Sequence, residues 1–167
     1  IDFLGLPMIF NDGQAENHLV IALTNNNFFA TLHPAQDSNI VFDRKSSISV
    51  WFVVDVAQGS AAAVRTWALT SYDEWHDAKV ALTAAPGNWD IRRSDDLSGN
   101  PLNESLNGWQ LTPREDLTLL PGQSLVLTLS GFTSKSPDGP TSGYVQVLMP
   151  PFDASGKATN PIQKVIG

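Results

Sequence analysis

Short apolar stretches broken by turn residues dominate the chain. "HLVIALT" (18–24) and "SISVWFVVDV" (47–56) are rich in β-branched and other apolar residues, which is typical of buried strands. "SLVLTLSGF" (124–132) and "GYVQVLM" (143–149) alternate apolar and polar positions, as half-buried strands do. The same reading predicts further strands at 63–71, 77–84 and 88–94, and around Ile162 and Val165.

Turn residues separate these stretches at regular intervals. "NDG" (11–13), "APGN" (85–88) and "SPDGP" (136–140) are examples. A spacing of about 8–12 residues between such signals is typical of β-sandwiches and β-barrels. The pattern therefore predicts an all-β, two-sheet antiparallel β-sandwich, immunoglobulin-like or jelly-roll-like, with long loops and one domain over 1–167.

The segment "GWQLTPREDLTLLPGQSLVLTLSGF" and the residues after it support this fold. In "LPGQS" (120–124), Pro121 presets φ and Gly122 accepts a positive φ, so a type II turn should lead into the next strand. A polar hairpin, "SPDG", then precedes "GYVQVLM". Over residues 109–164, about a third of the chain, this order resembles the second half of bacterial immunoglobulin-like or fibronectin-like sandwich modules. The resemblance implies a fold and no particular function.

Composition narrows the classes of partner. The net charge is -7 and the pI about 4.7, so phosphate-rich nucleic acid is not an expected partner. No apolar run has the roughly 20 residues of a membrane span, and we expect no membrane insertion. The chain has no Cys, which excludes disulfides, thiolate zinc sites and a Cys nucleophile.

The chain opens on "IDFLGLP" rather than on Met, which we interpret as a processed or trimmed sequence. Together with the expected sandwich fold, this favours a secreted protein that acts outside the cell or on its surface.

Motifs for catalysis are missing from the sequence. The three His residues, His18, His33 and His76, have no metal-ligand spacing, and no G-x-S-x-G nucleophile elbow occurs. We therefore expect that the protein is not an enzyme. A hydrolase with two paired carboxylates remains a lesser alternative.

Acidic residues concentrate in one part of the chain. Seven of the 17 lie between positions 71 and 104. The simplest interpretation is a solvated acidic face. A calcium site is the sharper alternative, because calcium takes six to eight oxygen ligands and "RRSDDLSGN" offers Asp95, Asp96 and Asn100 in one loop. Calcium is the only cofactor that the sequence suggests.

Five Trp residues provide candidate stacking surfaces. Trp51 and Trp67 lie in apolar stretches and are expected in the core, whereas Trp75, Trp89 and Trp109 neighbour polar or turn residues. In "TSYDEWHDAK" (70–79) a loop would expose Trp75 beside Asp73 and His76, and the next loop would add Trp89 and Asp90. If the stretch were instead extended, alternation would turn Trp75 toward the core.

These residues favour a non-catalytic binding module, most directly a carbohydrate-binding, lectin-like one. The expected ligand residues are Asp73, Trp75, His76, Trp89 and Asp90, with the Trp rings stacking on sugars and the polar groups bonding hydroxyls. The alternative is a structural or assembly module of a fibre, toxin complex or surface protein. "FFATLHP" (28–34) would then be an interface with a protein surface or with another copy of the chain.

Overall fold

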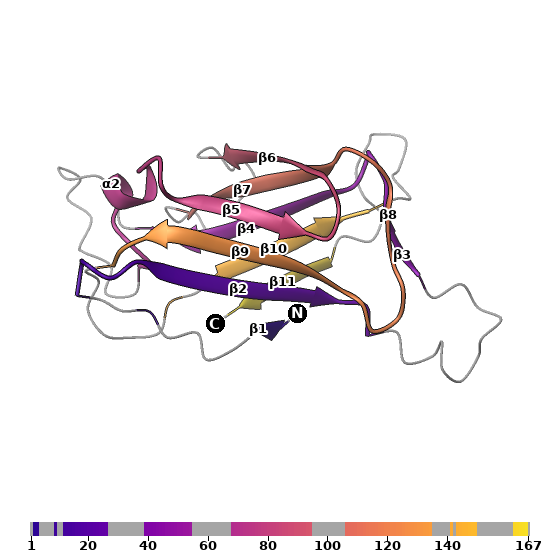
Figure 1. Cartoon of the computed structure of the whole chain (residues 1–167), viewed down its shortest axis with the longest axis horizontal. Coiled ribbons are helices and arrows are strands. Elements are labelled where there is room, and N and C mark those ends of the chain that lie inside the picture. The colour runs from indigo at the N-terminus through magenta and orange to yellow at the C-terminus, as the bar shows by residue number, and fades with distance from the viewer. Residues whose placement is uncertain are drawn as a thin grey trace.

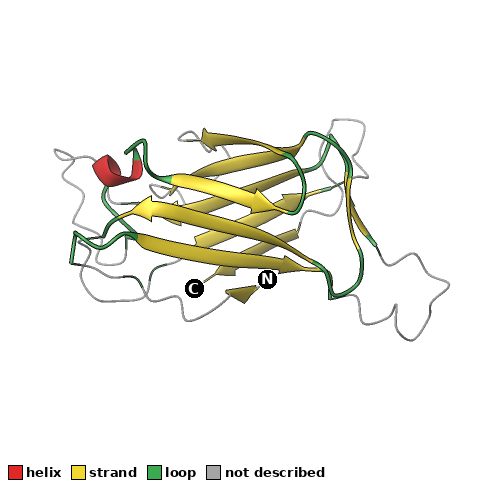
Figure 2. Cartoon of the chain, viewed as in Figure 1, coloured by secondary structure: helices red, strands yellow, loops and turns green. Residues whose placement is uncertain are grey.

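Two antiparallel sheets lie face to face in the structure, a computed structural model. It describes residues 2–3, 9, 12–26, 39–54, 68–94, 106–134, 141, 143–149 and 162–166. In Figure 1 the smaller sheet lies nearer the viewer and the larger one behind it. Figure 2 shows that strands make up nearly all of the regular structure. The expected all-β sandwich with antiparallel sheets is confirmed.

The smaller sheet has four strands in the order β1-β2-β9-β5. Their bounds are β1 Asp2–Phe3, β2 Asn17–Thr24, β9 Ser124–Phe132 and β5 Ala81–Ala85. β2 and β9 pair along their whole length, with one register irregularity between Asn17 and His18. β5 forms one edge of this sheet.

The larger sheet has five strands in the order β11-β10-β4-β7-β6. Their bounds are β11 Ile162–Ile166, β10 Gly143–Leu148, β4 Ser47–Val53, β7 Leu106–Pro113 and β6 Trp89–Ser94. A separate pair, β3 (Ile40–Phe42) with β8 (Leu117–Leu119), lies at one end of the sandwich (Figure 1). A short helix, α2 (Tyr72–Trp75), lies at the other end.

Alternate residues of the strands fill the space between the sheets. Leu125, Leu127 and Leu129 of β9 are fully buried, and so are Ile48 and Val50 of β4. Leu, Ile, Val, Phe and Trp side chains from both sheets form one continuous apolar cluster. Because successive side chains of a strand point to opposite faces, the residues between these core positions lie on the outer faces.

The expected strands at 18–24, 88–94, 124–132 and 143–149 are confirmed within one or two residues. The "LPGQ" turn also forms, because Gly122 has a φ of 82° and the Gln123 N–H donates to the Leu120 carbonyl at 2.9 Å. The strand expected at 47–56 begins correctly, and its last two positions lie outside the described residues.

Two expectations are corrected over the described residues. Of the strand expected at 63–71, residues 63–67 lie outside the described residues, and residues 68–71 form an isolated bridge between Thr70 and Val54 instead of a strand. Within 77–84 the strand begins at Ala81, because Asp77 closes a turn first. Its carboxylate accepts the Lys79 N–H at 2.9 Å and its carbonyl accepts the Val80 N–H at 3.1 Å.

Among the helices that the structure describes, none is long and apolar enough to span a membrane.

Candidate functional site

Trp75 lies in the core, so the expected solvent-facing role is corrected. "TSYDEWHD" forms neither an open loop nor an extended strand but helix α2, whose N-cap Ser71 accepts the Glu74 N–H at 3.3 Å. One helical turn directs Trp75 inward, where its exposure is 0%. Its ring centroid lies 4.5 Å from that of Trp109 and 5.9 Å from that of Phe52. No ring face is left for a ligand.

The expectation that Trp89 and Trp109 are candidate stacking surfaces is corrected for the same reason, because both rings are buried. Trp89 is 8% exposed, donates its indole N–H to the Pro86 carbonyl at 3.0 Å, and meets Phe42 edge to face at 5.8 Å. Trp109 is 4% exposed and lies under the guanidinium of Arg93, 5.3 Å from it. Both residues belong to the apolar core cluster and present no stacking surface.

The remaining expected ligand residues do not meet. Asp73 and His76 lie at α2, where the His76 ring stacks on Tyr72 at 4.0 Å and its Nδ1 lies 2.8 Å from the Tyr72 carbonyl. Asp90 lies at the start of β6, whereas α2 lies beyond the other end of that strand (Figure 1). The five residues therefore do not form one site.

The residues of the expected calcium loop, Asp95, Asp96 and Asn100, lie outside the described residues. So do Trp67 and the expected interface at 28–34. In the part of the chain that the structure does describe, no three His, Asp or Glu side chains gather as a metal site would require.

A different set of polar residues lines up on the outer face of the five-stranded sheet. Cross-strand partners share a face of a sheet. Arg92 of β6 pairs with Gln110 of β7, Gln110 with Ser49 of β4, and Ser49 with Gln146 of β10. We call these four residues the polar row. It covers three strand spacings, about 14 Å.

The four residues of the polar row differ in burial. Arg92 and Gln110 are exposed, Gln146 is half-buried, and Ser49 is only 8% exposed. The short Ser49 side chain therefore lies below the two longer glutamines that flank it. Gln110 and Gln146 each carry an amide with one acceptor and two donor hydrogens, so the row offers hydrogen bonds of both kinds.

Two aromatic residues flank the polar row on the same face. Trp51 and Tyr144 are direct cross-strand partners, one step along the strands from Ser49 and Gln146. Both are half-buried and pack against the buried residues Val53 and Ala68. We call Trp51 and Tyr144 the aromatic pair. The Trp51 indole N–H is covered and has no hydrogen-bond partner, which is uncommon for a buried donor.

Trp51 reaches the outer face because of the register of β4. Ile48, Val50 and Phe52 fill the core, and the intervening Trp51 must therefore point outward. Its β7 partner, Gly108, has no side chain, and a Cβ there would lie only 2.8 Å from Trp51 Cδ1. The expectation that Trp51 is a core residue is corrected. The alternating serines of "SISVWF" were the sequence signal that identifies the outward face.

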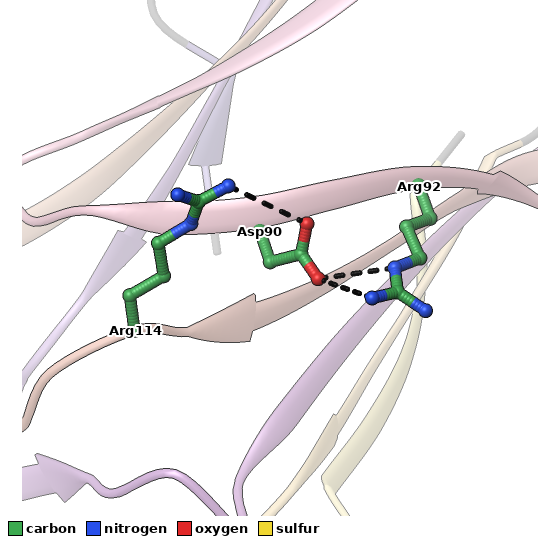
Figure 3. A network of polar contacts seen from close by, with 3 residues as sticks. All are labelled: Asp90, Arg92 and Arg114. Atoms are coloured by element: carbon green, nitrogen blue, oxygen red, sulfur yellow. Dashed lines mark hydrogen bonds and ion pairs between the residues drawn. The ribbon is translucent and has the colours of Figure 1, made fainter.

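Charged groups close the other corner of the same face (Figure 3). Asp90 Oδ2 lies 3.0 Å from Arg92 Nε and 2.8 Å from Arg92 Nη2, and Asp90 Oδ1 lies 3.7 Å from Arg114 Nη2. We call Asp90, Arg92 and Arg114 the arginine cluster. Asp90 is thus the expected ligand residue that shares this face with the polar row.

No known family, curated protein or solved structure matches this chain. The resemblance of residues 109–164 to immunoglobulin-like or fibronectin-like modules stays a prediction.

Proposed function

We propose that this chain is a non-catalytic carbohydrate-binding module whose ligand lies across the outer face of the five-stranded sheet. One observation carries the proposal: the aromatic pair, Trp51 and Tyr144, lies next to the polar row on one face. The proposal keeps the class of function expected from the sequence and moves the site away from α2.

The chemistry of this face suits a sugar. A pyranose ring presents C–H groups on its faces, which pack well on the flat, weakly negative face of an aromatic ring. Its hydroxyls both donate and accept, and amides such as those of Gln110 and Gln146 do the same. The polar row and the aromatic pair together extend further than one sugar ring, which favours a segment of a polysaccharide over a single sugar.

The same face favours binding over hydrolysis. Glycoside hydrolases use two carboxyl groups that face each other across the scissile bond, about 5 Å or about 6.5–9.5 Å apart. Among the outward side chains of β4, β6, β7 and β10 that the structure describes, Asp90 is the one carboxylate. We accordingly propose no covalent step. A location outside the cell or on its surface, where polysaccharides are accessible, is part of the proposal.

Affinity electrophoresis against a panel of plant, algal and microbial polysaccharides tests the proposal. Trp51→Ala and Tyr144→Ala should each weaken binding about tenfold, the factor that corresponds to about 1.4 kcal/mol. Tyr72→Ala is the matched control, because Tyr72 is an exposed aromatic residue of α2 that belongs to neither the aromatic pair nor the polar row. A folded protein that retains no polysaccharide would refute the proposal. Loss of binding in Tyr72→Ala alone would return the site to α2.

Calcium is tested in the same gels. Binding should be equal with added calcium and with EDTA if the aromatic pair and polar row form the site. Binding that EDTA abolishes would instead place the ligand near the loop of Asp95, Asp96 and Asn100.

A second candidate, an assembly module, has one observation in its favour. β5 is an edge strand, and its exposed side chains are Ala81, Thr83 and Ala85. Exposed edges usually carry charges or Pro that prevent pairing with another strand, and these three positions carry neither. Sedimentation at several concentrations tests whether copies associate. If they do, Thr83→Lys should return the protein to the monomer, and a monomer at every concentration would eliminate this candidate.

A further inference from the structure

The arginine cluster holds more positive than negative charge on the proposed sugar-binding face (Figure 3). Two guanidinium groups share one carboxylate. The residues beside them in the register, Gln110 and Thr112, are uncharged. The excess positive charge stands out in a chain whose net charge is -7.

Most of the hydrogen-bonding capacity of Arg114 is unused. Its single contact with Asp90, at 3.7 Å, is too long for a hydrogen bond. Arg92 differs, because its Nε and Nη2 both lie within 3.0 Å of the same Asp90 oxygen. Asp90 thus orients Arg92 while leaving the planar fork of Arg114 open, and such a fork matches a carboxylate with two parallel hydrogen bonds.

Stability does not account for the cluster. The side chains of Arg92 and Arg114 are 77% and 61% exposed. Ion pairs at such exposure contribute between zero and about 1 kcal/mol. The cluster shares Arg92 with the polar row, and this position favours a role in binding the ligand.

We propose that the ligand is an acidic polysaccharide, whose sugar carboxylate binds Arg114 while its rings contact the aromatic pair. This inference rests on the proposed function. Trp51 pairs with Gly108 of β7. Arg114 comes six residues after Gly108, just past the end of β7, so about 20 Å separates the two positions along the strand. The ligand must therefore be an oligomer of several sugars, because no single uronic acid reaches both ends.

The acidic residues around α2 do not cancel this local charge. Asp73, Glu74 and Asp77 lie around α2, at the far end of the sandwich (Figure 1). The screening length is about 8 Å at physiological ionic strength, so they act weakly on the cluster. Glu115 and Asp116 are exposed in the turn directly after Arg114, so they repel an acidic ligand and offset part of the attraction to the cluster. Because salt screens this repulsion as well as the attraction, they should make binding less sensitive to salt.

The test first compares polysaccharides with and without their carboxylate charge and then uses two other anionic polymers as controls. Polygalacturonate and alginate are each offered beside their carboxyl-reduced forms. Dextran sulfate tests whether sulfate replaces carboxylate, and polyglutamate tests whether an anionic chain without sugar rings is sufficient. We expect at least one acidic polysaccharide to bind tenfold or more tightly than its reduced form, since hydrogen bonds to charged groups contribute about 1.5–3 kcal/mol.

Three variants should change the binding of the acidic polymer in different ways. Arg114→Gln should weaken binding of the acidic polymer about tenfold or more, because it removes the fork. Asp90→Asn should strengthen it, because the competing carboxylate is removed. Lys79→Gln, which removes the same charge from an exposed position before β5, should leave it unchanged.

Each outcome has a defined meaning. Equal binding of the acidic polymer and its carboxyl-reduced form would overturn this inference while leaving the carbohydrate-binding proposal intact. Weaker binding by Asp90→Asn would do the same, because it would show that Asp90 accepts hydrogen bonds from neutral hydroxyls of the ligand. Preferential binding of dextran sulfate would likewise exclude a carboxylate ligand. Polyglutamate binding that Trp51→Ala does not change, or no binding of any polymer, would refute both proposals.

Discussion

Trp75 and Trp109 stack in the core with their ring centroids 4.5 Å apart and their planes inclined by 52°. Trp75 belongs to helix α2 and Trp109 to β7 of the five-stranded sheet, so the pair fixes the helix to the sandwich. Phe52 of β4 joins them at 5.9 Å from Trp75. The residue that looked like a ligand contact in the sequence is thus one of the largest fully buried side chains.

Trp75→Ala should lower the free energy of unfolding by about 3–5 kcal/mol, as truncation of a large buried aromatic usually does. Urea denaturation followed by Trp fluorescence measures this change. Tyr72→Ala, in the same helix but 38% exposed, is the control and should lose less than about 1 kcal/mol. Equal midpoints for Trp75→Ala and the unmodified protein would show that the ring is not in the core.

Gly108→Ala should be strongly destabilising for a backbone reason. A Cβ at this position would collide with the Val50 carbonyl oxygen of the neighbouring strand. We expect a loss of about 2–3 kcal/mol. Gly122→Ala is the contrasting variant, because a Cβ there meets nothing within 4 Å and only the φ of 82° is unfavourable, at about 1 kcal/mol. Thermal melts that rank Gly122→Ala as the more harmful would contradict the close approach of β4 and β7.

Adjacent arginines of β6 should respond differently to the same substitution. Arg93 faces inward, donates from Nη2 to the Val80 carbonyl at 2.7 Å, and lies over the Trp109 ring. Arg93→Met leaves that carbonyl without its partner and should lose about 1–3 kcal/mol of stability. Arg92→Met, on the exposed face, should lose less than about 1 kcal/mol. Chemical denaturation of both variants tests the alternation of β6, and similar losses would argue against it.

Asp12 should titrate below its ordinary pKa of 3.8. Its Oδ1 accepts the backbone N–H groups of Ala15 and Gln14 at 2.8 Å each, and these bonds favour the ionised form and lower the pKa. A lowered folded-state pKa means that the stabilisation is fully present above the unfolded-state pKa, near 3.8, and is lost as the pH falls through the folded value.

Carbon NMR of the carboxyl groups measures the Asp12 titration directly. Asp12→Asn should remove this midpoint, and the stability difference between the variant and the unmodified protein should shrink as the pH falls below 3.8. A midpoint at or above 3.8 would mean that the turn at 12–15 does not hold in solution.

The sequence determined the class of fold and most of the strands. "SLVLTLSGF" became β9 at the expected positions because strict alternation suits only a half-buried strand, and Pro121 and Gly122 set the preceding turn through their own backbone preferences. Such features depend on residues that are neighbours in the sequence. β7 was not predicted, because Asn107, Gly108 and Pro113 weaken its pattern, and the strand is held from both sides by β4 and β6.

Tertiary structure decided which side chains meet. Five Trp residues can be counted in the sequence, yet only the fold decides their burial. Trp75 is buried because one turn of α2 carries it over Trp109, and Trp51 lies half-buried on the outer face because Ile48, Val50 and Phe52 occupy the inward positions of β4. The polar row depends on the register of four strands that are far apart in the chain. Register depends on long-range strand pairing, and for this reason the residue pattern predicted the sandwich while only the folded sheet placed Trp51, Gln110, Gln146 and Asp90 on one face.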